Sequence, residues 1–224
     1  MCRGIILSFL SFSLCLAAAN DALDATLNRI DKAGSQFKGM EAKFKSTKHT
    51  DIVNDNSDSF GVIRIKDINH KILGVLDFQK PDKKTVALND KTVEIFLPNI
   101  NTVQVMDLGS HKNLVEQFIL FGFGTSRSDL EKAYNVSLGG SETINGEPTT
   151  RLELTSKSPE VAQKLSKFEL WISDKSGEPV QQKFYEPSHD YTVFTYSDMH
   201  LQVPSDNTLK PKYPSNVKRE KLNK

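Results

Sequence analysis

Cysteine is almost missing from this sequence of 224 residues. The only two cysteines, Cys2 and Cys15, lie near the N-terminus, and residues 20–224 contain none. A disulfide framework, a thiolate metal site and a cysteine nucleophile are therefore excluded for that part of the chain. A domain without these supports depends on its own hydrophobic core, and about 200 residues can supply one.

An excess of charge of one sign is also lacking. The sequence has 29 basic and 28 acidic residues, a net charge of +1, which argues against a protein that binds nucleic acid by neutralising phosphates. The exception is residues 210–224, where six basic side chains, one acidic side chain, Pro211 and Pro214 predict a basic tail with little structure. We expect this tail either to contact an anionic membrane or an acidic partner, or to be solvated without a function.

Long hydrophobic runs are confined to the first nineteen residues, which have the pattern of a signal peptide. A basic start at Arg3 precedes the apolar run Ile5–Leu16, and Ala17–Ala19 supplies small residues at the cleavage position. The run is too short to span about 30 Å of hydrocarbon. A lipid-modified Cys15 is disfavoured because a leucine precedes it. We therefore expect residues 1–19 to be removed and the protein to be exported.

The sequence also lacks a catalytic or ligand-binding motif. Its five histidines are scattered, and it has neither a nucleophile elbow nor a phosphate-binding glycine loop. Asn54–Asp58 begins like a calcium loop, but Ile65 stands where the loop requires glutamate, so a polar hairpin loop is predicted instead. We therefore predict no enzyme activity, no cofactor and no metal.

The sequence does contain regular hydrophobic patterns. Helical spacing predicts an amphipathic helix over Asp21–Lys38, and shorter helices over Lys112–Phe121 and Ser128–Tyr134. Elsewhere apolar and polar residues alternate in about eleven short runs, which predict one large, curved, antiparallel sheet and a mainly β protein of the α+β class. These runs begin at Met40 and recur at 61–66, 72–78, 86–88, 93–97, 103–105, 134–138, 149–155, 167–173, 179–186 and 191–199.

The order of these elements resembles that of the LolA-type outer-membrane lipoprotein carriers and lipoprotein-sorting proteins. The resemblance covers nearly all of residues 20–209. This sequence differs where the family commonly has aromatic residues, often Trp and Tyr, before the proline of its central strand. The segments that carry the resemblance are Phe44, Gly61–Arg64, Phe78–Lys83, Asn89–Pro98, Val103–Val105, Phe168–Ile172, Gly177–Pro179 and Tyr191–Phe194.

The resemblance implies an unclosed antiparallel β-barrel, or half-barrel, with a helical lid over an apolar cavity. It also implies a periplasmic protein that binds the acyl chains of lipoproteins or other lipids. Such a carrier receives its cargo from an inner-membrane transporter and delivers it to an outer-membrane acceptor. On this interpretation residues 20–209 form a single lipid-carrier domain, and we expect a monomer. The alternative is a regulatory protein of the same fold that senses a lipid or a misfolded protein.

The concave face of such a sheet is expected to bind lipid, although a fully packed core is the alternative. We further predict that Leu114–Gly124 is a movable lid, with Gly122 and Gly124 giving its backbone freedom. An ordinary core helix is the alternative for this segment. The expected cavity residues are Phe44, Ile63, Ile65, Leu76, Phe78, Val93, Ile95, Leu97, Val103 and Val105, and those of the lid are Leu114, Phe118, Ile119 and Phe121.

Overall fold

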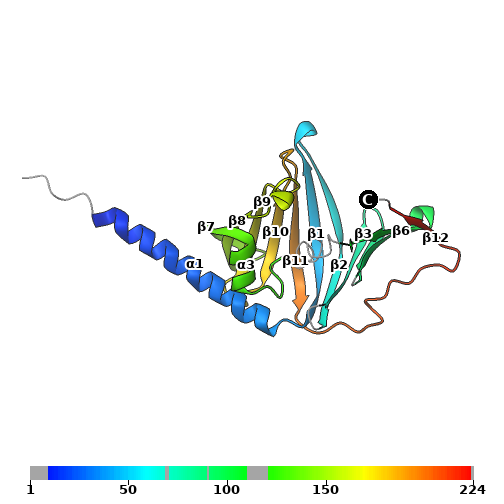
Figure 1. The fold of residues 1–224 in the computed structure, drawn as a ribbon, viewed down its shortest axis with the longest axis horizontal. Helices are drawn as coiled ribbons and strands as arrows, with labels where there is room; N and C mark the ends of the chain where they lie inside the picture. The colour runs from blue at the N-terminus through cyan, green and yellow to red at the C-terminus, as the bar shows by residue number, and fades with distance from the viewer. Residues whose placement is uncertain (1–9, 69–70, 90, 110–120, 223–224) are drawn as a thin grey trace, which may run out of the picture.

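A computed structural model describes residues 10–68, 71–89, 91–109 and 121–222 (Figure 1). Within them, helix α1 precedes a large sheet, and two short helices, α3 and α4, lie later in the chain. The helices are α1 Leu10–Gln36, α3 Arg127–Ala133 and α4 Pro159–Ala162, with the 3-10 turns η1 Asp51–Val53 and η2 Pro98–Ile100. The strands are β1 Gly39–Thr50, β2 Asp55–Ile68, β3 Lys71–Lys80, β4 Lys84–Leu88, β5 Thr92–Leu97, β6 Thr102–Asp107, β7 Tyr134–Ile144, β8 Glu147–Ser156, β9 Lys167–Ser173, β10 Pro179–Tyr185, β11 Tyr191–His200 and β12 Lys218–Lys221.

All the described strands form one open sheet. Their order is β12-β6-β5-β4-β3-β2-β1-β11-β10-β9-β8-β7, so β12 and β7 are the two edges and the sheet does not close on itself. Neighbouring strands are antiparallel except β12, which runs parallel to β6. Pairing of β1 with β11 joins the first half of the chain to the second. The predicted half-barrel, mainly β with few helices, is confirmed.

Helix α1 covers part of one face of this sheet, which we call the inner face. Its side chains Leu27, Ile30 and Ala33 are buried at helical spacing, so the helix is amphipathic, as predicted. Gly34 lies so close to the carbonyl oxygen of Thr125 that a side chain at position 34 would collide with it. The loop after residue 120 can therefore pack directly against the helix.

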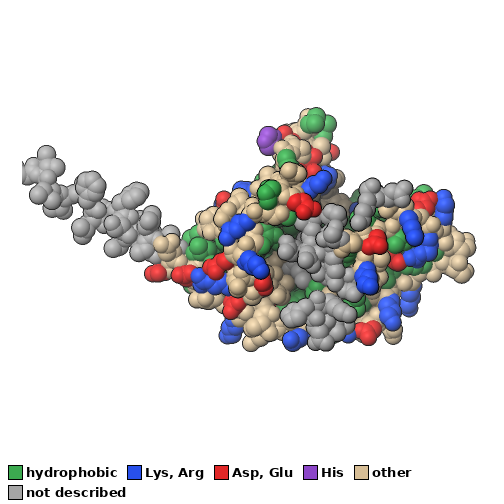
Figure 2. Space-filling model, in the orientation of Figure 1, with side chains coloured by type: hydrophobic (Ala, Val, Ile, Leu, Met, Phe, Trp, Pro, Cys, Tyr) green, Lys and Arg blue, Asp and Glu red, His purple; other side chains and the backbone are tan. Residues whose placement is uncertain are grey.

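The β1–β2 hairpin extends beyond the neighbouring strands, with the turn η1 at its tip (Figure 1). The tip carries hydrophobic side chains (Figure 2), and Ile52 is 91% exposed. The turn lies at Asp51–Asn54, and β2 begins at Asp55. The loop predicted around Asn54–Asp58 is thus displaced toward the N-terminus, because the polar residues after position 54 pair with β1.

The chain after β11 contains turns but no helix or strand up to residue 217, and the prediction of little structure from residue 210 fails at β12. Leu209 is buried against Val75 and Ala87 on the face opposite α1, which we call the outer face. Tyr213 then packs against Phe96, and the chain ends its described course in β12. Buried apolar contacts and an edge strand hold this segment, which we call the C-terminal strap, despite its charged composition.

Candidate functional site

The inner face gathers most of the predicted cavity residues. Cross-strand pairing aligns Ile63 with Leu76 and places the other members on the same face. Five of them are buried, and Leu76 and Ile95 pack against the same hydrophobic cluster. The register also places Leu97 on this face, where it is half-buried. The residues that the register assigns to the inner face are Phe44, Ile63, Ile65, Leu76, Phe78, Val93, Ile95 and Leu97.

Val103 and Val105 do not belong to this surface, and their prediction as cavity residues is wrong. Val103 pairs with Phe96, and Val105 pairs with Glu94. Successive side chains of a strand point to opposite faces, so these residues lie opposite Ile95. They share the outer face with the C-terminal strap.

The predicted lid can be assessed only at its end. Leu114, Phe118 and Ile119 lie outside the described residues. Phe121 is buried on the inner face, where its ring lies 4.8 Å from that of Phe168 and 5.6 Å from that of Phe184. Its contacts are those of a core residue.

A continuous run of aromatic rings crosses the inner face. Phe44 contacts Phe78 at a centroid distance of 5.0 Å and Phe194 at 5.7 Å. Phe184 continues the run at 6.3 Å from Phe194, and Phe168 lies 5.8 Å beyond it. Phe168, Phe184 and Phe194 are not among the cavity residues predicted from the sequence. The period-two alternation of β9, β10 and β11 was the signal that could have indicated them.

A cavity of about 400 Å³ opens on the inner face, toward the tip of the β1–β2 hairpin. Phe78, Phe184, Phe194 and Leu165 give it apolar walls, while serine, threonine and charged side chains form the rest of its lining. The polar part of the lining consists of Ser46, Lys48, Ser57, Ser59, Lys84, Glu186 and Thr192. The ammonium of Lys84 lies 4.3 Å from the centre of the Phe78 ring, so the cation borders the apolar wall directly.

A buried polar chain fixes the segment after residue 120 to the sheet. Gln182 is 1% exposed, and its side-chain amide donates a hydrogen bond to the carbonyl oxygen of Phe121. The hydroxyl of Tyr196 donates to Gln182 Oε1 over 2.8 Å. Burial raises the pKa of Tyr196 above its usual range, so the hydroxyl remains a donor. The polar atoms are thus satisfied inside an apolar cluster.

Replacing Tyr196 by phenylalanine is expected to lower the free energy of unfolding by about 1–3 kcal/mol, because Gln182 Oε1 would be left buried without its donor. Urea unfolding measures this loss. Tyr213→Phe is the matched control, because that hydroxyl donates to Glu94 over 2.7 Å at a partly exposed site where water can replace it. Equal losses in the two variants would contradict the anchoring role of the buried chain.

A buried carboxyl lies at the turn between β9 and β10, beneath α1. Gly177 packs against the carbonyl oxygen of Arg29, which places the adjacent Glu178 under the helix. Glu178 is 3% exposed, and its Oε2 atom has no hydrogen-bond partner among the described residues. Burial raises the pKa of Glu178 to about 7, because the charged form loses its hydration.

The described residues contain no group of three or more histidine, cysteine, aspartate or glutamate side chains arranged to hold a metal ion. None of the helices traced through them is both long enough and apolar enough to cross a bilayer.

Comparison with protein-family models gives no match, and comparison with curated proteins gives none either. Several solved structures are similar. MucB aligns with a TM-score of 0.53 and 17% identity over 90% of this chain, which spans 65% of the MucB chain. Lipoprotein LppX of Mycobacterium tuberculosis aligns with a TM-score of 0.52 and 15% identity, over 83% of this chain and 99% of that one. A LolA superfamily protein from Nitrosomonas europaea matches at a TM-score of 0.42 and 15% identity, over 84% of this chain and 97% of that one.

The matches to MucB and LppX, with TM-scores above 0.5, define the class of structure. The chain has the open half-barrel fold, and the resemblance predicted from its sequence is confirmed at the level of the fold. Because every identity is below 20%, the likeness extends to the fold alone.

Proposed function

We propose that this protein is a periplasmic carrier that holds the acyl chains of a lipid or lipoprotein against its inner face. The observation that carries the proposal is the cavity of about 400 Å³, with phenylalanine and leucine walls beside a polar rim. Its size lies within the range of about 300–1,000 Å³ typical of ligand pockets. Apolar walls suit an acyl chain, while Lys48 and Lys84 are placed to meet the polar end of the lipid.

The energy of acyl chains in water explains why a carrier is needed. Each buried methylene contributes about 0.8 kcal/mol, so a sixteen-carbon chain gains roughly 12 kcal/mol on leaving water. Spontaneous release into water is therefore negligible, and loading and delivery each require a membrane partner. We propose an inner-membrane transporter for loading and an outer-membrane acceptor for delivery, with the monomeric carrier moving between them.

A lipid-sensing regulator of the same fold is the second candidate. MucB shares the fold over 90% of this chain, and solved structures show MucB in complex with MucA. A regulator would bind lipid in the same cavity but would not pass it on. Transfer of a fluorescent lipid from donor to acceptor vesicles therefore separates the two functions.

Replacing Ser59 by tryptophan is expected to reduce the lipid bound by the purified protein about tenfold, which corresponds to about 1.4 kcal/mol. Ser59 faces the cavity and is half-buried, so the indole would occupy the space of an acyl chain. Lipid extraction followed by mass spectrometry measures the occupancy. Ser141→Trp on the exposed part of β7 is the matched control. Absence of lipid from the unmodified protein, or equal occupancy in both variants, would contradict lipid binding in this cavity.

A further inference from the structure

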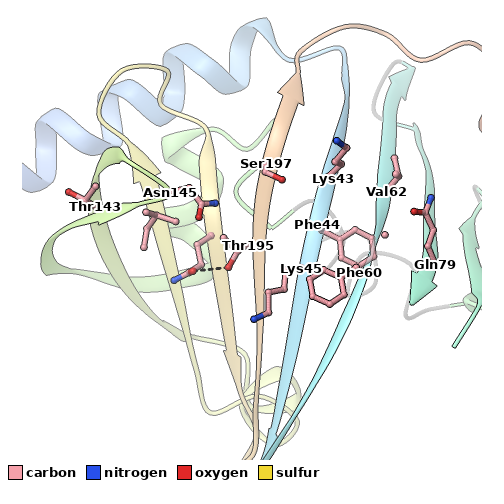
Figure 3. Close-up of a pocket in the computed structure, with 13 residues that line it drawn as sticks. Lys43, Phe44, Lys45, Phe60, Val62, Gln79, Thr143, Asn145, Thr195 and Ser197 are labelled. Carbon is pink, nitrogen blue, oxygen red and sulfur yellow. Dashed lines mark hydrogen bonds between the residues drawn. The ribbon is translucent and has the colours of Figure 1, made fainter. Parts of the chain in front are cut away.

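A second hollow lies on the outer face of the sheet, on the side opposite the proposed lipid cavity. Two cavities of about 660 Å³ and 420 Å³ adjoin there and share Lys45, Gln181 and Thr195 in their linings. Together they form a trough across β2, β1, β11 and β10, which we call the outer trough. Figure 3 shows the lining of the larger cavity. The proposed carrier function does not use this surface.

The tip of the β7–β8 hairpin forms one wall of the outer trough. Thr143, Ile144 and Asn145 line it, although β7 is at the far edge of the sheet (Figure 3). The side-chain amide of Asn145 donates to the carbonyl oxygen of Tyr196 over 3.4 Å, which ties the hairpin tip to β11. The trough is thus enclosed by a specific tertiary contact.

The charges in and around the trough are already paired. Lys43 contacts Asp198 at 2.7 Å, and Lys45 contacts Asp58 at 2.9 Å. Farther along, the Arg151 guanidinium lies 3.5–3.6 Å from the carboxylates of three residues, Glu142, Glu153 and Glu169. The Glu169 carboxylate also pairs with the ammonium of Lys167 at 2.9 Å.

The remaining cation, Lys183, is held by aromatic rings. Its ammonium lies 3.7 Å from the centre of the Tyr191 ring and 4.5 Å from that of Tyr185. When the ion-pair partners of the lining residues are counted with them, the region has five basic and five acidic side chains, which balance. Most of the charged side chains already face a partner of opposite sign, and Lys183 is held by two aromatic rings, which makes a neutral ligand the better match.

The uncharged lining consists of hydrogen-bonding groups beside apolar surface. Gln181 Oε1 accepts a hydrogen bond from the Thr195 hydroxyl over 2.8 Å (Figure 3), and Gln79 and Ser197 add an amide and a hydroxyl. Phe60 stands among them and is 44% exposed, which is unusual for a phenylalanine. Hydroxyl and amide groups both donate and accept, and an aromatic ring offers a flat apolar surface.

We propose that the outer trough binds a neutral oligosaccharide. A sugar ring carries hydroxyl groups that donate and accept hydrogen bonds around its edge, and it has an apolar face of C–H groups. The edge matches the amides and hydroxyls of the trough, and the apolar face matches Phe60. A neutral oligosaccharide carries no net charge, unlike an acidic glycan, a phosphate or a charged peptide.

Binding of the full chain to an array of neutral and acidic glycans tests the proposal. The probes are short neutral cello-, malto- and chito-oligosaccharides, together with sulfated and uronic-acid glycans. We expect binding to at least one neutral series. Failure to bind every neutral glycan, or binding to acidic glycans alone, would overturn the proposal.

Two variants then locate the site. Gln181→Ala and Phe60→Ala are each expected to weaken binding about tenfold, or about 1.4 kcal/mol. Gln202→Ala and Ile100→Ala change an exposed glutamine and an exposed hydrophobic residue away from the trough and should leave binding unchanged. Binding that survives both trough variants would place the sugar elsewhere and refute the assignment. Ser59→Trp acts on the inner face, so glycan binding should survive it whether or not the lipid proposal holds.

Discussion

Replacing Phe44 by alanine is expected to lower the free energy of unfolding by about 3–5 kcal/mol, the usual cost of deleting a buried phenylalanine. Phe44 is 2% exposed and connects Phe78 to Phe194 in the aromatic run. It also covers Gly61 on the neighbouring strand, since two of its ring atoms lie within 3 Å of the position that a Cβ of residue 61 would occupy. The truncation would therefore open a cavity that main chain and neighbouring rings cannot fill. Urea unfolding, monitored by far-ultraviolet circular dichroism, measures the loss.

Phe60→Ala is the matched control for this prediction. Phe60 lies on β2, the strand next to β1, and is 44% exposed on the outer face. Its truncation should therefore change the free energy of unfolding by no more than about 0.5 kcal/mol. If Phe44→Ala cost no more than the control, the inner face would not be a close-packed aromatic layer.

Replacing Glu178 by glutamine is expected to raise the stability at pH 8 by up to about 3 kcal/mol, because a shift of one pKa unit corresponds to about 1.4 kcal/mol. The pKa of Glu178 rises from 4.5 to about 7 on folding, so the folded state holds its proton more tightly than the unfolded state does. The favourable contribution of this proton is fully present below pH 4.5 and is lost as the pH rises to about 7. Glutamine has nearly the same shape and cannot ionise.

The measurement is the difference in unfolding free energy between the variant and the unmodified protein from pH 4.5 to pH 8. The difference should be small at pH 4.5 and should grow up to about pH 7. Glu131→Gln on α3 removes an exposed carboxylate and should show no such rise, apart from the small effect of its surface ion pair with Arg127. A difference that is constant across the range would show that Glu178 is hydrated in the folded protein.

Much of the fold follows from local patterns in the sequence. The alternation in β1, where Ala42 and Phe44 face inward between charged residues, is sufficient to predict a half-buried strand. The spacing of Leu27 and Ile30 likewise predicts the side of α1 that packs on the sheet. Alternation does not reveal which face of the sheet is the inner one. In β6 the apolar positions Val103 and Val105 face outward, on the face where the C-terminal strap packs Leu209 against Val75 and Ala87.

Pairings between distant residues explain what the sequence could not predict. The strap looks like a solvated tail because its lysines dominate the composition, whereas Leu209 and Tyr213 determine its position. Gln182 reads as a polar residue of a strand, yet it is almost fully buried because Phe121 and Tyr196 satisfy its amide from other parts of the chain. The cavity, similarly, depends on Phe78, Phe184 and Phe194 meeting from three strands.

The pairing of β12 with β6 has a consequence for how the chain folds as it is made. Strands β1–β6 emerge before Lys218–Lys221, both at the ribosome and during the export proposed above. At about 5–20 residues per second, the chain between them takes several seconds to synthesise. During that interval the main-chain groups of Thr102–Asp107 have no neighbour on one side, and an unpaired strand edge is a template for other chains. In the incomplete chain β6 is thus one of two unpaired edges, because β1 also lacks its partner until β11 has emerged. A chaperone that shields the β6 edge would be needed only until residue 221 has emerged.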